Sequence, residues 1–288
     1  MFYPYSEKMI AVVYSGSKNA CWKISQDGKT MIETHTAGIN PCFNDPKQTL
    51  QILSKNITLI HNAESIKKIY VFAAGASAKE KQEELANTLE QFFVNSKIKV
   101  KDDLYGAAIA ACHDQTGIVG ILGSGANCAY YNGKKPEKNN YGLGYILADE
   151  GSANYFGKML LKNFLEDKLP EDLKTKIEAQ YHLDRPSILE RVYRKPLVQT
   201  YLASFLDFYL ENRNHKFIQQ LVTQGFEKYF STYILPTLEK HPNEAIHFVG
   251  SVAGHFQDQL REVASGHGIN IMSVTREPIH NILNYYTN

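Results

Sequence analysis

The first half of the chain alternates short apolar runs with segments of helical periodicity. Two segments, Ala78 to Phe93 and Leu104 to Cys112, carry apolar residues at the spacing of an α-helix. Strands are predicted where apolar runs stand between turn residues, at Met9 to Tyr14, Ala20 to Ile24, Ile69 to Ala73, Lys97 to Val100, Gly117 to Leu122 and Cys128 to Tyr131. Strands that alternate with helices in this way are typical of an α/β fold.

The second half of the chain is mainly helical between Ser152 and about Lys240. Aromatic and aliphatic residues recur there at helical spacing, which predicts that they pack into a core. Strand signals return at Ala245 to Val249 and at Ile269 to Val274, with a helix predicted between them up to Val263. The helical region therefore stands between two groups of strands.

Two segments that lie far apart in the chain resemble each other. Val12 to Trp22 and Gly120 to Tyr130 each contain an apolar strand, a Gly/Ser turn, an Asn, small residues and then an aromatic residue. A repeated strand-turn-strand unit suggests two lobes of related architecture, although one pair of short segments can also match by chance.

Length, composition and charge narrow the class of protein. The 288 residues favour two modest lobes, and a hydrophobic content of 43% is enough for a buried core. With 31 basic and 30 acidic residues, the chain has no basic excess that would indicate a nucleic-acid groove. The apolar stretches are too short to cross a bilayer, and the first residues lack the pattern of a signal peptide. The four cysteines form no CxxC pair, so we expect reduced, mostly buried thiols in a cytoplasmic protein without nucleic-acid or membrane partners.

Glycine and serine follow three of the predicted strands. The three junctions are Ser15-Gly16-Ser17, Gly123-Ser124-Gly125 and Gly250-Ser251. Small residues at such a point let backbone N–H groups approach an anion, and the third junction also opens a predicted helix. Each junction alone is a common strand connection, but three in one chain favour a nucleotide cleft between two lobes.

Acidic residues stand at two further junctions. Asp103 lies between a predicted strand and a helix rich in small residues, where it could be a general base or only a helix cap. Asp149 and Glu150 follow an apolar run and precede the helix that begins after Ser152. One of these acids could act as a base, and another could orient a substrate or hold a metal-bound water.

Recognised motifs for metals and nucleophiles are absent from the sequence. No H-x-x-x-H or C-x-x-C pair occurs, and there is no G-x-S-x-G nucleophile elbow or G-x-x-x-x-G-K-[ST] loop. Hydrolase and zinc functions therefore have little support, and no metal-binding residue is assigned.

Several of these segments together resemble one known family. The matching stretches are Gly123 to Asn127, Gly142 to Ser152, Phe248 to Phe256, Ala37 to Pro41, Asp103 to Ala108 and Tyr193 to Pro196. They resemble the N-acetylglucosamine kinases, which are grouped with the BadF/BadG/BcrA/BcrD-type ATPases. The resemblance runs in order from about residue 10 to the C-terminus, and its most specific part is the spacing from Gly123 to Ser152.

The resemblance implies an actin-like ATPase fold related to ribonuclease H. Each of two lobes would contain a mixed sheet flanked by helices, and the second lobe would carry a large helical insertion. The N-terminal lobe would comprise residues 1–110, joined by residues 276–288. The C-terminal lobe would comprise residues 111–275, with its helical region at residues 152–240, and members of the family often form homodimers through their helical lobe.

The resemblance also implies an ATP-dependent sugar kinase that uses Mg²⁺. Such an enzyme transfers the γ-phosphate of ATP to a hydroxyl of an amino sugar: N-acetylglucosamine, or a relative such as glucosamine or N-acetylmuramic acid. Asp103 matches the family's general base. The residues expected to hold the sugar are Asn40, Ser124, Asn127, Gly142, Asp149 and Glu150. The residues expected to hold the nucleotide are Ser15, Gly16, Ser17, Lys18, Gly123, Ser124, Gly125, Gly250, Ser251 and Gly254.

The first Gly/Ser turn departs from the family pattern. Relatives begin this turn with an acid and continue with Thr residues, whereas this chain has Tyr14 and then Lys18-Asn19-Ala20. The loss of the acid should weaken the hold on hydrated Mg²⁺. Lys18 is either a compensating charge near the phosphates or a solvated loop residue. A degenerate kinase that binds sugar or nucleotide without turnover is therefore an alternative, whereas an ATPase that activates a redox partner would need a cysteine cluster that this chain lacks.

Overall fold

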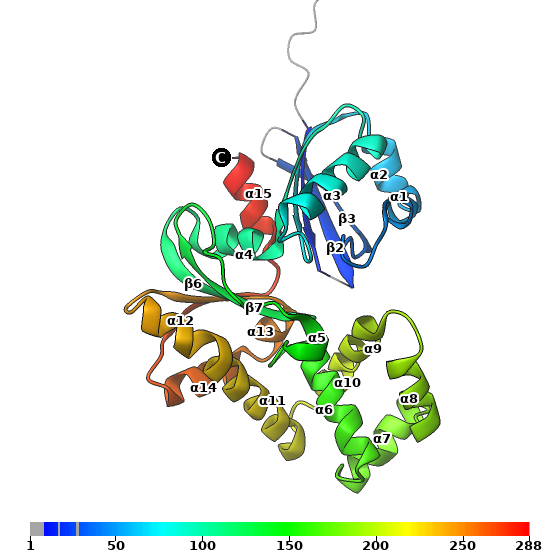
Figure 1. The fold of residues 1–288 in the computed structure, drawn as a ribbon, viewed down its shortest axis with the longest axis vertical. Coiled ribbons are helices and arrows are strands. Elements are labelled where there is room, and N and C mark those ends of the chain that lie inside the picture. Colours follow the sequence, from blue (N-terminus) through cyan, green and yellow to red (C-terminus); the bar gives the residue numbers. More distant parts are fainter. Residues whose placement is uncertain (1–8, 17, 27–28, 288) are drawn as a thin grey trace, which may run out of the picture. The chain divides into compact units, whose positions relative to one another are not determined.

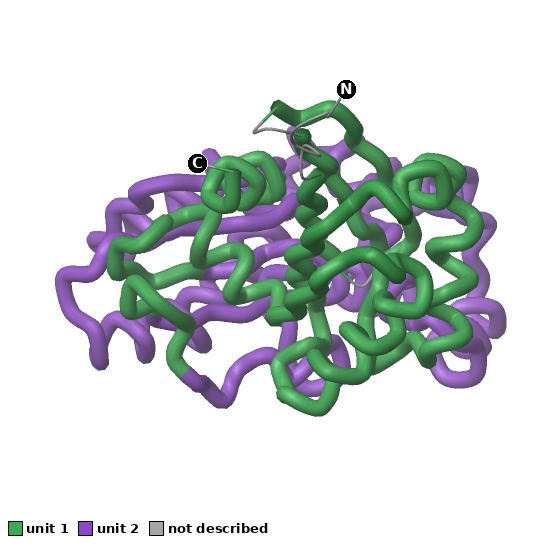
Figure 2. The backbone as a smooth tube through the Cα atoms, turned by 90° about the horizontal axis from the view of Figure 1, so that it is seen from above, with its two compact units in different colours: residues 1–119, 131–137, 277–288 green, residues 120–130, 138–276 purple. Residues whose placement is uncertain are grey.

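The computed structural model describes residues 9–16, 18–26 and 29–287. The chain divides into two compact units, which Figure 2 distinguishes along the backbone. The first unit contains the chain up to residue 119, residues 131–137 and the segment from residue 277 onward, and the second contains residues 120–130 and 138–276. The C-terminal segment therefore belongs to the same unit as the N-terminal strands.

The first unit is built on a five-stranded sheet. Its strand order is β3 (Lys29–Ala37), β2 (Asn19–Gln26), β1 (Met9–Ser15), β4 (Ile66–Ala73) and β5 (Lys97–Asp102). β1, β4 and β5 are parallel to one another, whereas β2 is antiparallel to both of its neighbours. The first Gly/Ser turn connects β1 to β2, so it lies at the end of the central strand.

Helices cover both faces of this sheet. Because side chains alternate along a strand, Ala11 and Val13 face one side of β1 and Val12 faces the other. The first face packs against α1 (Pro46–Ser54), α2 (Ile57–Asn62) and α3 (Lys79–Phe92). The second face packs against α4 (Asp103–Cys112) and the C-terminal helix α15 (Ile279–Thr287), as Figure 1 shows.

A four-stranded sheet runs through the second half of the fold. Its strand order is β7 (Ala126–Asn132), β6 (Thr116–Leu122), β8 (Ile246–Val249) and β9 (Ile271–Thr275). A strand and its hairpin partner are thus followed by two later strands, which repeats the order β2-β1-β4-β5 of the first sheet. The predicted fold class, two mixed sheets flanked by helices, is confirmed.

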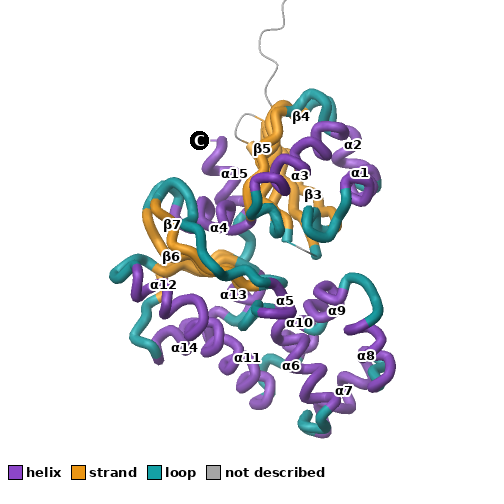
Figure 3. The backbone as a smooth tube through the Cα atoms, in the orientation of Figure 1, coloured by secondary structure: helices purple, strands orange, loops and turns teal. Residues whose placement is uncertain are grey.

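Helices make up most of the second unit (Figure 3). They are α5 (Gly144–Leu147), α6 (Ala153–Leu165), α7 (Glu171–Tyr181), α8 (Arg185–Tyr193), α9 (Val198–Ser204), α10 (Leu206–Glu211), α11 (Lys216–Tyr229), a π-helical turn (Phe230–Ile234), α12 (Leu235–Lys240), α13 (Ser251–His255) and α14 (Gln257–Gly266). The aromatic residues of this region form its core, as predicted. Phe156, Tyr209 and Phe226 are fully buried, and the Tyr209 hydroxyl donates to the carbonyl of Phe156 at 2.9 Å.

Some elements differ from the sequence expectation. The pattern did not indicate β3, α1, α2 or α15, and the helix predicted up to Val263 is divided at Phe256 into α13 and α14. The sequence pattern did not predict β3 because it is an edge strand whose residues are exposed or only half-buried, so it has no apolar run.

Two further expectations concern the burial of the cysteine thiols and the absence of a membrane-spanning segment. None of the four cysteines forms a disulfide, and Cys112 and Cys128 are buried. Cys21 is only half-buried and Cys42 is exposed, so the expectation of mostly buried thiols holds for half of them. Among the described residues, no helix combines the length and the apolar character that a membrane crossing requires.

Candidate active site

The side chain of Ser15 fixes the first Gly/Ser turn. Its Oγ accepts a hydrogen bond from the backbone N–H of Ile39 at 2.8 Å and donates to the carbonyl of Ile39 at 3.0 Å. The N–H of Gly16 donates to the carbonyl of Asn19 at 3.0 Å, which closes the turn. The hydroxyl of Ser15 is thus engaged by the protein itself.

The other residues of this turn that are expected to bind the nucleotide are Gly16, Ser17 and Lys18. Lys18 is exposed. A methyl group placed on Gly16 would meet no atom closer than 3.8 Å, so a ligand could approach the backbone there. Ser17 lies outside the described residues.

Asn40 lies beside Gly75, which follows β4. Its side chain is buried, and Oδ1 accepts a hydrogen bond from the N–H of Cys42 at 2.9 Å. Gly75 has a φ of +80°, and a Cβ there would stand 2.1 Å from Oδ1 of Asn40. Only glycine fits this position, because both the backbone conformation and the close approach exclude a side chain. Asn40 is thus held in one orientation.

Tyr14 lies where relatives carry an acid. Its side chain packs against the apolar cluster between the sheet and helices α4 and α15. Burial raises the pKa of the Tyr14 hydroxyl well above its ordinary value, and the nearby carboxylates of Asp103 and Asp102 raise it further. Tyr14 is therefore neutral at physiological pH and provides no carboxylate for a cation.

The two aspartates before α4 have different roles. Asp102 is the N-cap residue, because its Oδ1 accepts a hydrogen bond from the N–H of Tyr105 at 2.8 Å. Burial raises the pKa of Asp102, and this hydrogen bond lowers it in part. The interpretation of Asp103 as the helix cap is wrong, since Asp102 fills that position and Asp103 is the first residue of the helix itself.

The second Gly/Ser turn is fixed by backbone hydrogen bonds to the start of α6. The carbonyl of Gly123 accepts from the N–H of Ala153 at 2.9 Å, and the carbonyl of Ser124 accepts from the N–H of Asn154 at 3.1 Å. The side chain of Ser152 caps the same helix through the N–H of Tyr155 at 3.2 Å. The first N–H groups of α6 are therefore occupied, which leaves the turn itself as the candidate anion-binding segment.

Asp149 lies directly beside this turn and is 5% exposed. Its Oδ1 accepts a hydrogen bond from the N–H of Ala126 at 2.9 Å, and the amide of Asn154 donates to its Oδ2 at 3.4 Å. A Cβ on Gly125 would stand 3.1 Å from both carboxylate oxygens. Burial raises the pKa of Asp149, and the hydrogen bonds and the charge of Lys158 lower it in part. Asp149 itself has a φ of +69°, a left-handed conformation that aspartate tolerates better than most residues.

The other predicted sugar residues of this unit lie at two places. Gly142, with a φ of +72°, approaches Asn127 so closely that a Cβ would stand 3.0 Å from the amide nitrogen of Asn127. The carbonyl of Asn127 accepts from the hydroxyl of Tyr229 at 2.7 Å. Glu150 instead accepts a hydrogen bond from the hydroxyl of Tyr233 at 2.6 Å. Asn127 and Gly142 thus belong together, whereas Glu150 is engaged with the helical region.

Gly250 brings the third junction against the second turn. It has a φ of +125°, and a Cβ there would stand 2.4 Å from the carbonyl oxygen of Leu122. Ser251 begins α13 directly afterwards and is exposed. Gly254 lets the side chain of Arg276 pack closely, because a Cβ at position 254 would lie 2.5 Å from it.

The predicted residues therefore form one group within each unit. The first unit places Ser15 and Gly16 in the turn that is hydrogen bonded to the segment before Asn40, and Tyr14 lies near Asp103. The second unit brings together Gly123, Ser124, Gly125, Asp149 and Gly250.

Sequence analysis missed Asn154, which donates to Asp149. Asn154 is 4% exposed, and its Oδ1 has no hydrogen-bond partner among the described residues. A polar residue two positions after the Ser152 cap, within an apolar helix, is the signal that could have pointed to it.

We compared the chain with known protein families, curated proteins and solved structures. No protein-family model and no curated protein matches the chain. The crystal structure of a proposed N-acetylglucosamine kinase from Porphyromonas gingivalis shares 32% sequence identity, covers 98% of this chain and 99% of its own, and has a TM-score of 0.89. This chain belongs to the family of that protein. The family has the actin-like ATPase fold of the sugar kinases.

Two more distant structures share the fold of this sugar-kinase family. A proposed N-acetylglucosamine kinase from Chromobacterium violaceum is 15% identical over 98% of this chain and 99% of its own, with a TM-score of 0.73. A ROK-family glucokinase from Streptomyces griseus, solved with glucose and AMPPNP, is 12% identical over 96% of this chain and 97% of its own, with a TM-score of 0.56. The narrower assignment to the BadF/BadG/BcrA/BcrD group stays a prediction.

Proposed function

We propose that the chain is a kinase that transfers the γ-phosphate of ATP to a hydroxyl group of an amino sugar, N-acetylglucosamine or a close relative. The observation that carries the proposal is the placement of Asp149, a buried carboxylate fixed beside the Gly123 to Gly125 turn. Such a carboxylate accepts hydrogen bonds from sugar hydroxyls, and the turn next to it offers backbone N–H groups to phosphate.

Each unit carries fixed polar groups that a sugar could contact. In the second unit, Asp149 and Asn127 supply charged and neutral polar groups next to the turn, and the unpartnered Oδ1 of Asn154 offers a further acceptor close to Asp149. In the first unit, Asn40 offers an amide whose orientation is fixed by Cys42 and Gly75. Fixed polar groups of this kind distinguish one sugar from another, because a misplaced hydroxyl leaves a buried group unpaired.

Asp103 would accept the proton of the attacking sugar hydroxyl. Its place at the start of α4 puts the carboxylate at the end of β5, near Tyr14, and the helix cap is Asp102. Proton acceptance by a positioned base contributes typically about 10²- to 10⁴-fold to the rate. In-line phosphoryl transfer otherwise needs positioning and charge stabilisation more than covalent chemistry from the protein.

ATP fits the second turn and the third junction. A methyl group on Gly123 would meet no atom within 4 Å, so the backbone is accessible there, and Gly250 brings the start of α13 next to it. Bound ATP would supply the phosphoryl group. Ser124 and Gly125 would bind its phosphates through backbone N–H groups, because the N–H of Gly123 already donates to the carbonyl of Gly125 at 3.0 Å. Ser251 would follow on the nucleoside side.

Mg²⁺ does not fit the first turn as the family pattern would place it. Tyr14 is a neutral phenol, and the oxygen ligands that Mg²⁺ prefers are carboxylates, phosphates and water. The carboxylates near Tyr14 belong to Asp102 and Asp103 before α4 and not to the turn itself. We therefore derive no step through a cation held by this turn.

The kinase proposal is tested by incubating the purified chain with Mg-ATP and a panel of amino sugars. We expect a phosphosugar from at least one of them, and a loss of turnover of about 10²- to 10⁴-fold in Asp103→Asn with the sugar affinity retained. The absence of product from every sugar at high enzyme concentration would refute the proposal.

The neutral Tyr14 favours one alternative, a degenerate kinase that binds sugar or nucleotide without turnover. Calorimetry separates the two functions. Heat of binding for an amino sugar or ATP analogue, together with undetectable turnover, would establish the alternative. Robust turnover that Asp103→Asn abolishes would exclude it.

A further inference from the structure

The register of β2 and β3 assembles four polar side chains on one face of the first sheet. Cys21 stands directly opposite His35, and Lys23 stands directly opposite Glu33. Because residues two apart on a strand share a face, all four side chains point to the same side of the sheet. Cys21 packs against the cluster between the sheet and α15, so this is the face that α15 partly covers.

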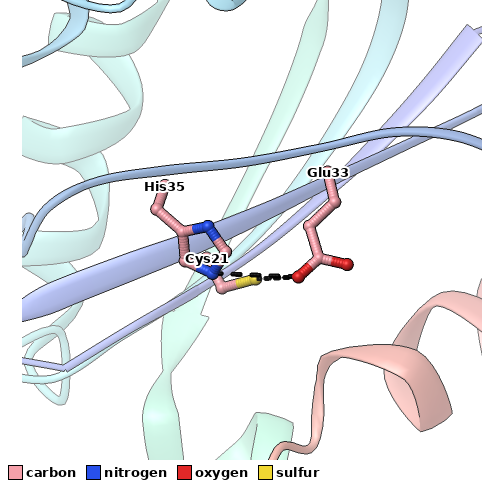
Figure 4. Close-up of side chains that lie close together, drawn as sticks. All are labelled: Cys21, Glu33 and His35. Carbon is pink, nitrogen blue, oxygen red and sulfur yellow. Dashed lines mark hydrogen bonds and ion pairs between the residues drawn. The ribbon is translucent and has the colours of Figure 1, made fainter.

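Three ligand atoms of this group converge on one point. The Sγ of Cys21, a carboxylate oxygen of Glu33 and a ring nitrogen of His35 all lie within 4.8 Å of one another, as Figure 4 shows. Oε1 of Glu33 is 3.9 Å from Sγ of Cys21 and 3.8 Å from Nε2 of His35. Ligands of a tetrahedral Zn²⁺ ion stand roughly 3.3–3.5 Å apart, which follows from bond lengths of about 2.0–2.3 Å. The two pairs that involve Glu33 are thus within about half an ångström of this spacing, and the third pair, Sγ of Cys21 and the ring nitrogen of His35, lies within 4.8 Å and would have to close further.

Lys23 holds the glutamate in the orientation that coordination needs. Its side chain is 1% exposed, and Nζ donates to Oε2 of Glu33 at 2.6 Å. The same Nζ lies 2.7 Å from Nε2 of His280 on α15. Since Lys23 binds Oε2, the other oxygen, Oε1, faces Cys21 and His35. Partners that fix a ligand in this way are a common part of metal sites in proteins.

The charges around the group also balance a divalent cation. A Cys21 thiolate and the Glu33 carboxylate carry two negative charges at the point where the three ligand atoms meet. These two negative charges match the two positive charges of a divalent ion.

We propose that Cys21, Glu33 and His35 bind a divalent cation of the Zn²⁺ class, with a fourth position open to water. A thiolate, an imidazole and a carboxylate together favour zinc over the hard cations Mg²⁺ and Ca²⁺, which prefer oxygen ligands alone. The site lies on the strand that follows the first Gly/Ser turn, and Cys21 is the register partner of Tyr14 on β1. It is separate from the phosphate chemistry of the proposed function and does not depend on it.

The test is Zn²⁺ binding to the full chain, freed of metal by a chelator and carrying no affinity tag. Titration calorimetry should show one Zn²⁺ ion bound per chain, and Co²⁺ in its place should give a thiolate charge-transfer absorption. In Cys21→Ser and His35→Ala the Zn²⁺ affinity should fall more than about 100-fold, since removing mere supporting partners of a metal site already costs 10- to 100-fold. The absorption should vanish in Cys21→Ser.

Matched controls come from the same unit. Cys42→Ser removes an exposed thiol and His61→Ala removes an exposed imidazole on α2, and both variants should bind Zn²⁺ like the unmodified chain. Because the side chain of His35 is 62% exposed, its replacement should leave the fold intact, and Zn²⁺ should raise the Tm of the unmodified chain but not of His35→Ala. A millimolar or weaker affinity in the unmodified chain would overturn the proposal. Equal affinity in the site variants and the controls would overturn it as well.

Discussion

The two Gly/Ser turns end equivalent strands of their sheets, but different interactions hold them. In the first turn the hydroxyl of Ser15 bonds to both backbone groups of Ile39. In the second turn the carbonyls of Gly123 and Ser124 accept from the start of α6, and a carboxylate stands beside the turn. At the second turn the carboxylate of Asp149 accepts a hydrogen bond from the backbone N–H of Ala126, whereas the hydrogen bonds of the first turn, among the described residues, come from the Ser15 hydroxyl and the backbone.

The difference shows that the hydrogen bonds that form a turn do not depend on whether an acidic side chain stands beside it. The hydrogen bonds of the first turn do not involve the side chain at position 14, so Tyr14 can replace an acid without disturbing them. Tyr14 instead packs against the apolar layer under α4 and α15. Replacement of an acid by Tyr at this position therefore removes a charge from the site but adds apolar contact to the core.

The largest loss of stability is expected from a substitution of Gly250, which lies against the second turn. Gly250→Ala would place a Cβ 2.4 Å from the carbonyl oxygen of Leu122 at a φ of +125°, so we expect a loss of about 3 kcal/mol in the free energy of unfolding. Urea denaturation measures it. Gly16→Ala in the first turn is the control and should change stability by less than about 0.5 kcal/mol, because nothing lies closer than 3.8 Å. Equal losses in both variants would remove the contrast between the turns.

A smaller effect is expected from Asp149→Asn, which keeps the shape but removes the charge. A hydrogen bond to a charged group contributes about 1.5–3 kcal/mol, so KM for the sugar should rise about 10- to 100-fold with a smaller change in kcat. The oxygen of the new amide can still accept from the N–H of Ala126, whereas its NH₂ group would face the amide nitrogen of Asn154, which donates to Oδ2 of Asp149. An unchanged KM would mean that Asp149 does not contact the sugar.

The same variant makes a prediction about pH and stability. The pKa of Asp149 is raised in the folded chain, so keeping it ionised costs stability once the pH is above the unfolded pKa. The unmodified chain should therefore lose stability as the pH rises through the folded pKa. Asp149→Asn should be the more stable of the two near neutral pH, and the difference should shrink in acid, below about pH 4. Chemical denaturation at several pH values measures both curves.

The smallest effect is expected on turnover when Tyr14 is replaced. If the missing acid limits activity, Tyr14→Asp should raise turnover about tenfold and make it more sensitive to the Mg²⁺ concentration, because a carboxylate is a ligand that the phenol cannot replace. Tyr14→Phe retains the ring that packs under α4 and should leave turnover unchanged. A folded Tyr14→Asp protein with the original activity would show that the first turn works without its acid.

The sequence predicted the elements that carry apolar runs and the glycines between them. It could not predict which of two adjacent aspartates caps α4, because Asp102 and Asp103 are chemically equivalent and only the backbone geometry separates them. It also could not predict the partnership of Asp149 with Asn154, since this depends on the left-handed backbone at Asp149. Such contacts follow from how the chain turns, which a one-dimensional pattern does not contain.

The metal-binding group illustrates the same limit. The sequence shows no spaced pair of cysteine or histidine ligands, and for that reason it gave zinc little support. Cys21 and His35 become neighbours only through the pairing of β2 with β3, and β3 is a polar edge strand that the pattern did not indicate. A ligand set that depends on strand register cannot be recognised until the strand itself is known.

The position of α15 has a consequence for how the chain folds during synthesis. This helix packs against α4 and covers one face of the first sheet, although it is made after every residue of the second unit. While the ribosome is still translating, Val12 and Phe72 lack part of their cover, so the N-terminal sheet emerges with an exposed apolar face. The cover of this face is therefore completed only after the second unit has been synthesised.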